Sequence, residues 1–138
     1  MIQEDKILLI KDLSARLPYA VTVEHTSGFR GTLHNITIHH MYDDNDNVYD
    51  AICYTDFFGD NDDIYIEYFK PYLFPLSSMT EEQRQELESL MEVTTVPVWG
   101  EILSPTPEYY DWLNKNHFDY RSLIEKGLAL DATGLNIY

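Results

Sequence analysis

The sequence predicts an α+β fold with an N-terminal helix, a small antiparallel sheet of four to five strands, and C-terminal helices packed on that sheet. Three observations lead to this prediction. Apolar residues recur at helical spacing over 4–17, stretches of alternating apolar and polar residues follow between 21 and 69, and a helix-capping pattern begins at Thr80. A small, strongly bent sheet of this kind also matches an SH3-like or Sm-like barrel.

The first helix is expected over residues 4–17. Its apolar side carries residues that recur at helical spacing, namely Ile7, Ile10, Leu13 and Leu17. Pro18 ends the helix, because proline disfavours the helical conformation in the residue before it. Its charged residues are expected on the polar side, and these include Lys6, Lys11, Asp12 and Arg16.

Four strands are expected next, over residues 21–24, 31–39, 48–55 and 64–69. The second strand needs a bulge or bend near Asn35, because Leu33 and Ile36 would otherwise point to opposite faces of the sheet. Pro71 is expected to end the fourth strand, since proline has no N–H group to donate to a neighbouring strand.

A helix over residues 80–92 is expected after the last of these strands. Thr80 and Gln83 have the spacing of a capping box, in which each side chain accepts a hydrogen bond from the backbone of the other residue. An apolar stripe follows at helical spacing and consists of Leu87, Leu90 and Met91. Leu87 and Leu90 are expected to be buried against the sheet.

The C-terminal part predicts two further helices. Residues 93–101 fit either a short strand or a loop, because Pro97 interrupts an apolar run. Thr106 is expected to cap one helix with proline in its first position. Asp119 is expected to cap the last helix, which Gly127 ends, and the apolar tail that follows is expected to be ordered.

Three blocks of the sequence, LSARLPYAV, KPYLFPLSSMTEEQ and HFDYRSLIEKGLAL, resemble a family of short uncharacterised proteins. That family occurs in gut anaerobic bacteria and in their phages and mobile elements. The resemblance therefore implies a phage or mobile-element context. It implies no activity and no functional residues, because the family has none assigned.

Length and composition predict one domain, residues 1–138, in the cytoplasm. The single cysteine, Cys53, cannot form an internal disulfide, which fits a reducing compartment, and its apolar neighbours predict a buried, inert thiol. The N-terminal segment lacks the basic region and cleavage site of a secretory signal, and no apolar run is long enough to span a membrane.

Two acidic segments, 43–47 and 59–63, invite comparison with calcium-binding loops, but their spacing does not fit. An EF-hand loop that starts at Asp43 would place Val48 at the glycine position and Tyr54 at the position of the bidentate glutamate. No zinc-ligand spacing exists among the five histidines, namely His25, His34, His39, His40 and His117. No phosphate-binding loop or dinucleotide fingerprint occurs either, so we expect no metal and no cofactor.

The charge distribution in the middle of the chain is the most informative functional feature. No lysine or arginine occurs from Gly31 to Phe69, whereas eight aspartates and one glutamate lie between Asp43 and Glu67. Acidic groups interleaved with tyrosines can form a surface that binds a basic partner, or they can serve only solubility. The candidate partner-binding residues are Asp43, Asp44, Asp46, Asp60, Asp62, Asp63, Tyr42, Tyr49 and Tyr65.

These observations favour a non-catalytic module that binds a protein, although they do not decide whether the chain is an enzyme. The net charge of −15 disfavours direct binding to nucleic acid or to anionic membranes and favours a basic protein partner. One form of this hypothesis is an acidic mimic of nucleic-acid charge that inhibits a basic host protein. Two alternatives stay open: a small-molecule binder or enzyme with a site of Tyr, His and Asp side chains, and a structural protein that acts by self-association, with the oligomeric state undetermined.

Overall fold

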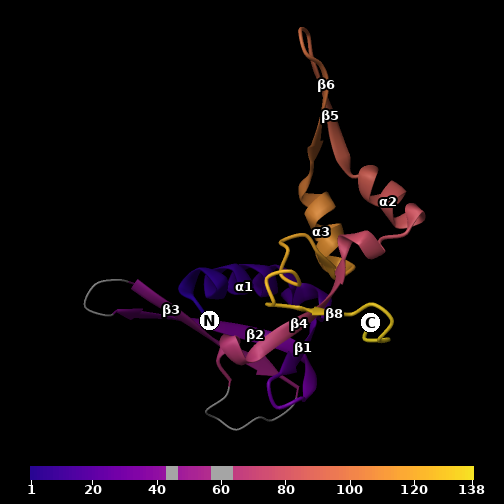
Figure 1. Cartoon of the computed structure of the whole chain (residues 1–138). Coiled ribbons are helices and arrows are strands. Elements are labelled where there is room, and N and C mark those ends of the chain that lie inside the picture. The colour runs from indigo at the N-terminus through magenta and orange to yellow at the C-terminus, as the bar shows by residue number, and fades with distance from the viewer. Residues whose placement is uncertain (43–46, 57–63) are drawn as a thin grey trace.

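A computed structural model describes residues 1–42, 47–56 and 64–138 of the chain, with the backbone alone for 39–42 and 47–49. The fold is α+β. Helix α1 (Gln3–Arg16) lies along a mixed sheet, and a unit built from two short helices and a β-hairpin projects away from that sheet (Figure 1).

The first helix is confirmed, and a 3-10 turn over Leu17–Tyr19 follows it. Leu9 and Leu13 have no exposed surface and pack into the main core. The expected apolar side is only partly correct, because Ile7 is 45% exposed. The hydrophobic side of the helix is therefore turned toward Leu9 and away from Ile7.

The assignment of Asp12 and Arg16 to the polar side of this helix is wrong, because both side chains are fully buried. The Arg16 guanidinium donates from Nε to Asp12 Oδ2 over 2.8 Å and from Nη2 to the carbonyl oxygen of Phe118 over 2.7 Å. Arg121 Nη1 donates to Asp12 Oδ1 over 2.8 Å. This buried charge network connects α1 to the C-terminal part of the chain.

The sheet contains strands in the order β3-β2-β1-β4-β7, with β8 also paired to β4. The antiparallel part consists of β1 (Thr22–His25), β2 (Arg30–Tyr42), β3 (Asn47–Thr55) and β4 (Phe69–Pro75). Two short strands, β7 (Phe118–Asp119) and β8 (Leu130–Asp131), run parallel to β4. The described strands form an open mixed sheet, so a closed SH3-like or Sm-like barrel is not confirmed.

The predicted irregularity of the second strand is confirmed. The register between β2 and β3 shifts between Leu33, which pairs with Thr55, and Asn35, which pairs with Tyr54. The turn before this strand contains Gly28 at φ +94°, a backbone conformation that glycine adopts without a steric penalty.

The predicted fourth strand, 64–69, is wrong. Ile66–Tyr68 forms a 3-10 turn that buries Ile66 in the core, and the strand runs instead from Phe69 to Pro75. Pro71 lies inside this strand opposite Val23. The Thr26 N–H donates to the Tyr68 carbonyl, so these two residues form a hydrogen-bonded pair. Hydrogen-bonded and non-hydrogen-bonded pairs alternate along an antiparallel ladder. Val23 and Pro71 therefore form a non-hydrogen-bonded pair, in which Pro71 needs no N–H group toward β1.

Helix α2 (Glu81–Glu88) begins with the predicted capping box between Thr80 and Gln83 but ends before the predicted position. Leu87 is buried, although it packs against Leu113 and Phe118 and not against the antiparallel part of the sheet as expected. Leu90 is only half-buried, and its carbonyl oxygen accepts a hydrogen bond from Thr106 Oγ1 over 2.6 Å.

The ambiguous segment after α2 forms a β-hairpin of β5 (Met91–Val96) and β6 (Gly100–Pro105). Its β-branched run favours strand over helix. The turn closes through a hydrogen bond from the Trp99 N–H to the Val96 carbonyl, with Gly100 at φ +85°. Helix α3 (Pro107–Lys115) follows with Thr106 as its cap, as predicted.

The predicted last helix is wrong, because residues 123–127 form turns. Asp119 nevertheless caps this segment, since its carboxylate accepts hydrogen bonds from the backbone N–H groups of Leu123 and Ile124 over 3.0 and 2.9 Å. Ser122 has φ +59°, which lies outside the right-handed helical region and interrupts a helix here. The tail is ordered as expected: the Tyr138 hydroxyl donates to the carbonyl oxygen of Tyr72 over 2.7 Å.

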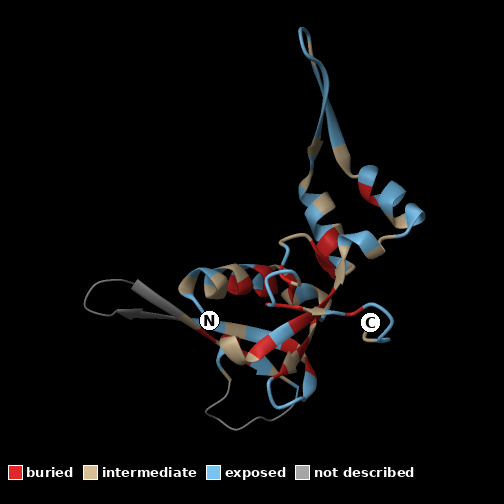
Figure 2. Ribbon diagram, viewed as in Figure 1, coloured by how far each residue is buried: buried red, intermediate tan, exposed pale blue. Residues whose placement is uncertain are grey.

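Buried residues gather in two places, one between α1 and the sheet and one where α2 and α3 meet the sheet, while the hairpin is exposed over most of its length (Figure 2). In the second place, the rings of Trp112 and Phe118 stack with their centroids 5.6 Å apart. No helix in the described part of the chain combines the length and the apolar character needed to cross a membrane.

Candidate protein-binding surface and a polar hollow

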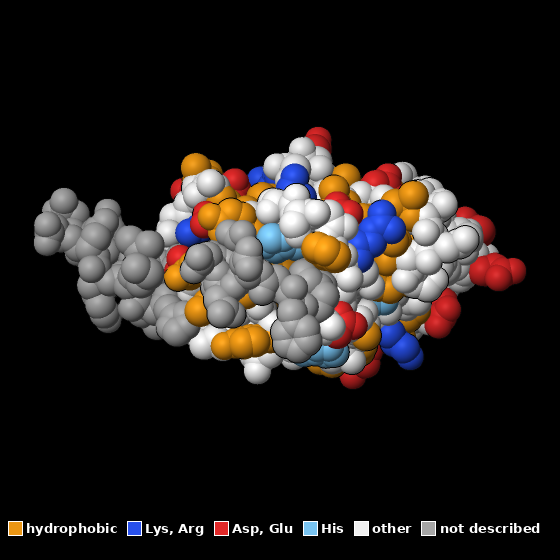
Figure 3. Space-filling model, turned by 90° about the horizontal axis from the view of Figure 1, so that it is seen from below, with side chains coloured by type: hydrophobic (Ala, Val, Ile, Leu, Met, Phe, Trp, Pro, Cys, Tyr) orange, Lys and Arg blue, Asp and Glu red, His pale blue; other side chains and the backbone are white. Residues whose placement is uncertain are grey.

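The acidic candidates from the sequence fall outside the described residues: Asp43, Asp44, Asp46, Asp60, Asp62 and Asp63. The side chains of Tyr42 and Tyr49 also lie outside the description, whereas Tyr65 is 37% exposed and pairs through its backbone with Ile52. The face opposite the hairpin carries hydrophobic side chains in separate patches between charged and histidine side chains (Figure 3). The acidic binding surface therefore stays a prediction.

The tip of hairpin β5–β6 is the most exposed apolar feature of the described chain. Val98 is 85% exposed and Trp99 is 82% exposed, and both lie at the end of the hairpin that is farthest from the sheet (Figures 1 and 2). A tryptophan in this position loses contact with water only when another surface covers it. An exposed apolar site on a projecting element is typical of a protein–protein contact.

One face of the hairpin is apolar near its base, and the pair of Thr95 and Glu101 separates this part from the tip. Val93 pairs with Leu103 across the two strands, and Met91 lies two positions before Val93 on the same face. Val93 and Leu103 are both more than half exposed. Ile102 lies on the opposite face and is also exposed. Two strands alone are marginally stable in water, so this element gains stability when another surface covers it.

The hairpin and the helices at its base are acidic. No lysine or arginine occurs from Gln85 to Asn114, and this stretch contains Glu86, Glu88, Glu92, Glu101, Glu108 and Asp111. The tip is apolar and the residues around it are acidic. A complementary partner surface has an apolar depression with basic residues around it. This surface is not among the sites predicted from the sequence, although the apolar run Val96–Trp99 indicates it.

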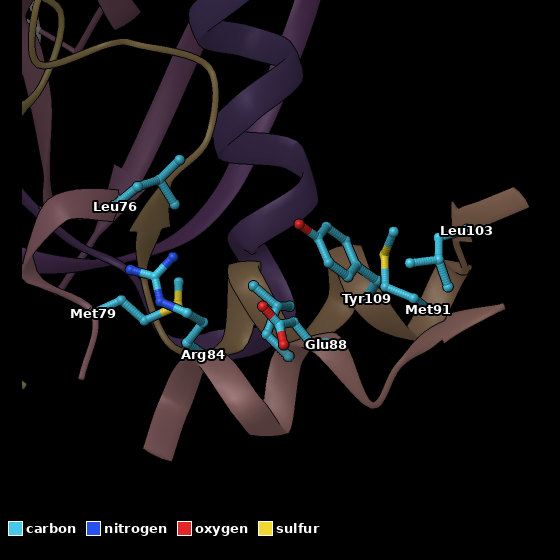
Figure 4. A pocket seen from close by; sticks show the side chains of 8 residues that line it. Leu76, Met79, Arg84, Glu88, Met91, Leu103 and Tyr109 are labelled. Carbon is cyan, nitrogen blue, oxygen red and sulfur yellow. The ribbon is translucent and has the colours of Figure 1, made fainter. Parts of the chain in front are cut away.

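A groove of about 400 Å³ lies at the base of the hairpin, where α2, the two strands and α3 meet (Figure 4). Its wall is mainly apolar and carries the polar ends of three side chains, those of Arg84, Glu88 and Tyr109. The apolar lining consists of Leu76, Met79, Leu87, Met91 and Leu103.

A second, more polar hollow of about 520 Å³ lies between α2, the end of α3 and the C-terminal tail. Its aromatic wall includes Phe74, Phe118 and Tyr138, and its polar lining includes Gln83 and Lys115. The capping box of α2 borders this hollow, so part of its polar lining is already engaged in holding that helix.

His117 is the unusual residue of this hollow. Its ring stacks on Tyr138 with the centroids 3.5 Å apart, its backbone has φ +61°, and its Nδ1 atom is buried without a hydrogen-bond partner in the described structure. Burial and the nearby charge of Arg16 lower the pKa of His117 from 6.5 to about 4. Burial raises the pKa of Tyr138 to about 12. Both groups are therefore neutral at pH 7.

The lowered pKa of His117 predicts a pH dependence of stability. The imidazole of His117 binds a proton less tightly in the folded state than in the unfolded state. The neutral imidazole therefore contributes fully to the free energy of unfolding above pH 6.5, and this contribution is lost as the pH falls toward 4. We expect the melting temperature of the wild type to fall more steeply over this interval than that of His117→Asn. Asparagine tolerates the positive φ at this position.

The measurement is thermal unfolding followed by circular dichroism at half-unit steps of pH. His34→Asn serves as the control, because His34 is exposed and this variant should keep the wild-type slope. Identical slopes in His117→Asn and the wild type would contradict the assigned pKa.

Cys53 and the histidines form no metal centre within the described residues. Cys53 is buried as predicted, and burial raises the pKa of its thiol to about 12, which keeps it protonated and unreactive. His25 is buried against Phe69, with Nδ1 2.6 Å from Ser27 Oγ. In the described part of the chain, no three His, Cys, Asp or Glu side chains come together in a way that could hold a metal ion.

No family model, no curated protein and no solved structure matches the chain. The resemblance to short proteins of gut bacteria and phages therefore stays an expectation.

Proposed function

We propose that this chain is a non-catalytic protein-binding module and that hairpin β5–β6 is its main contact element. The observation that carries the proposal is the exposure of Val98 and Trp99, at 85% and 82%, on the tip of a projecting element. Tryptophan is among the residues that contribute most to protein–protein binding, because it buries a large area at a low cost in side-chain entropy.

The partner is a basic protein with an apolar depression that receives the hairpin tip. The net charge of −15 and the absence of basic residues from Gln85 to Asn114 support this choice. Such a pair associates quickly at low salt and more slowly when salt screens the charges beyond about 8 Å. In its biological form, the proposal is that the chain mimics the charge of nucleic acid and inhibits a basic host protein. The context is a phage or mobile element, and the compartment is the cytoplasm.

Substitution of the tip tests the proposal directly. The immobilised full-length chain is exposed to an extract of the native host, and captured proteins are identified by mass spectrometry. We expect Val98→Ser and Trp99→Ser each to reduce capture of the partner at least about tenfold, as loss of a binding hot spot does. Both residues are highly exposed, so the melting temperature should not change.

Ile7→Ser is the matched control, because it also replaces an exposed aliphatic side chain but lies on α1 away from the hairpin. Capture that is undiminished in both tip variants would refute the hairpin as the contact element. A further variant with Asp60, Asp62 and Asp63 replaced by Asn tests the acidic surface predicted from the sequence. If only this variant loses the partner, the contact lies on that surface.

A second candidate function is supported by the hollow around His117. A neutral imidazole that stacks on a tyrosine is the kind of group that the small-molecule or enzyme alternative requires. A small molecule that fills the hollow would raise the melting temperature of the wild type by linkage and would not do so in His117→Asn. A small-molecule screen by thermal shift with these two proteins distinguishes this candidate from the first.

A further inference from the structure

We infer that the groove at the base of the hairpin receives an apolar side chain of the partner together with a neighbouring lysine or arginine. The partner's docking segment is therefore amphipathic and basic. This inference rests on the proposed function and adds a second contact to the hairpin tip. It follows from three features of the groove: its apolar lining, a carboxylate that forms no ion pair in the described part of the chain, and its continuity with the hairpin.

The apolar lining of the groove is adaptable. Two of its five apolar residues are methionines, Met79 and Met91, and the others are leucines. Methionine side chains are flexible and polarizable, and they are common where a surface accepts apolar side chains of varied shape. The lining therefore suits a side chain such as leucine or phenylalanine from another protein.

The polar lining of the groove contains one carboxylate, that of Glu88. The carboxylate of Glu88 lies at the centre of the lining, and it forms no ion pair within the described residues (Figure 4). Arg84 lies one turn earlier on α2 but extends toward Leu76 and Met79, and its Nε is 3.7 Å from Glu81. The attraction between a carboxylate and a cation is stronger where apolar groups exclude water. Glu88 is thus the group that would select a lysine or arginine.

The groove and the hairpin form one surface. Met91 and Leu103 line the groove and also belong to the two strands of the hairpin. Leu103 pairs with Val93 on the same face, and the pair of Thr95 and Glu101 lies between them and the tip. A partner that covers Trp99 and this face therefore reaches the groove without a change in the fold.

The same charges disfavour the other two occupants of the groove. A second copy of this chain would bring Glu92 and Glu101 of its hairpin toward Glu88, and like charges oppose that contact. An anionic membrane surface meets the same repulsion. A basic segment of another protein is the occupant that the charges favour.

Synthetic peptides test the inference without knowledge of the partner. The probe is a fluorescently labelled amphipathic peptide of leucine and lysine, compared with a leucine–glutamate and a serine–lysine counterpart, and binding to the full chain is measured by anisotropy. We expect only the leucine–lysine peptide to bind. Glu88→Gln should weaken its binding about fivefold or more, because the peptide lysine loses its partner.

Two matched pairs of variants locate the binding site. Glu86→Gln changes the net charge by the same amount as Glu88→Gln and lies on the same helix, but Glu86 does not line the groove. The Glu86→Gln variant should therefore bind the peptide as tightly as the wild type does. Leu103→Ser on the groove face should weaken binding, whereas Ile102→Ser on the opposite face should not. All four residues are exposed, so these variants should fold.

Several results would overturn the inference. Equal weakening by Glu86→Gln and Glu88→Gln would mean that only net charge attracts the peptide. Equal binding of the leucine–glutamate peptide would exclude a basic occupant, and a doubled molar mass in light scattering that Leu103→Ser abolishes would identify a second copy instead. If Trp99→Ser loses the native partner but Glu88→Gln and Leu103→Ser keep it, the groove inference fails while the proposed function stands.

Discussion

Replacement of Asp12 by alanine is expected to lower the free energy of unfolding by about 3–5 kcal/mol, the range found when one partner of a buried ion pair is removed. Asp12 accepts two hydrogen bonds from Arg16, at 2.8 and 3.0 Å, and one from Arg121 at 2.8 Å. Arg16 has no exposed surface, and its Nη1 atom already lacks a hydrogen-bond partner in the described structure. Without Asp12, the buried guanidinium of Arg16 would have no ion-pair partner among the residues that the structure describes.

Chemical denaturation of Asp12→Ala by urea measures this loss. Glu4→Gln is the control, because it removes an exposed acidic charge from the same helix and should cost about 1 kcal/mol or less. The double variant Asp12→Leu with Arg16→Met should lose less stability than Asp12→Ala, since it removes both buried charges. An Asp12→Ala variant as stable as Glu4→Gln would mean that the network is hydrated in solution.

Replacement of Asp119 by alanine is the second large expected loss, about 2–4 kcal/mol. Its carboxylate accepts hydrogen bonds from the backbone N–H groups of Arg121, Leu123 and Ile124 over 3.3, 3.0 and 2.9 Å. Asp119 and Leu123 are buried, so water cannot fully replace the carboxylate as an acceptor. Amide hydrogen exchange should show loss of protection at Leu123 and Ile124 in addition to the fall in stability.

Asp131→Ala provides the comparison for this variant. Asp131 accepts a hydrogen bond from the N–H group of Thr133 over 2.9 Å at an exposed site. Loss of this hydrogen bond should lower the free energy of unfolding by about 1 kcal/mol or less. Asp119→Asn retains one acceptor oxygen, so its free energy of unfolding should lie between those of Asp119→Ala and the wild type. Equal stability of Asp119→Ala and Asp131→Ala would contradict the role assigned to Asp119.

Elements with strong local signals could be predicted from the sequence. The capping box at Thr80, the Thr106 cap and the bulge at Asn35 depend on residues that are close in the chain, and the structure confirms all three. Asp119 also caps its segment as predicted, although the segment forms turns in place of a helix. The cap depends on local chemistry, whereas continuation of the helix depends on a conformation at Ser122 that the sequence pattern does not specify.

The buried charges and the candidate surfaces could not be predicted, because they depend on residues that are distant in the sequence. Asp12 and Arg16 have the spacing of an exposed pair on a helix, and only the packing of the C-terminal segment over them makes them buried. The groove likewise combines residues from Leu76 to Tyr109. Exposure of Trp99 follows from the direction of the hairpin, which local periodicity does not determine.

The contact between Arg16 and Phe118 also constrains how the chain folds during synthesis. The two residues are separated by 102 positions, and the hydrogen bond from the Thr22 N–H to the Tyr138 hydroxyl spans 116. Helix α1 is synthesised before the segment around Phe118 and Arg121 that buries its two charged side chains. Because closure of such long loops precedes the contacts that stabilise them, we expect this part of the chain to fold slowly for its length.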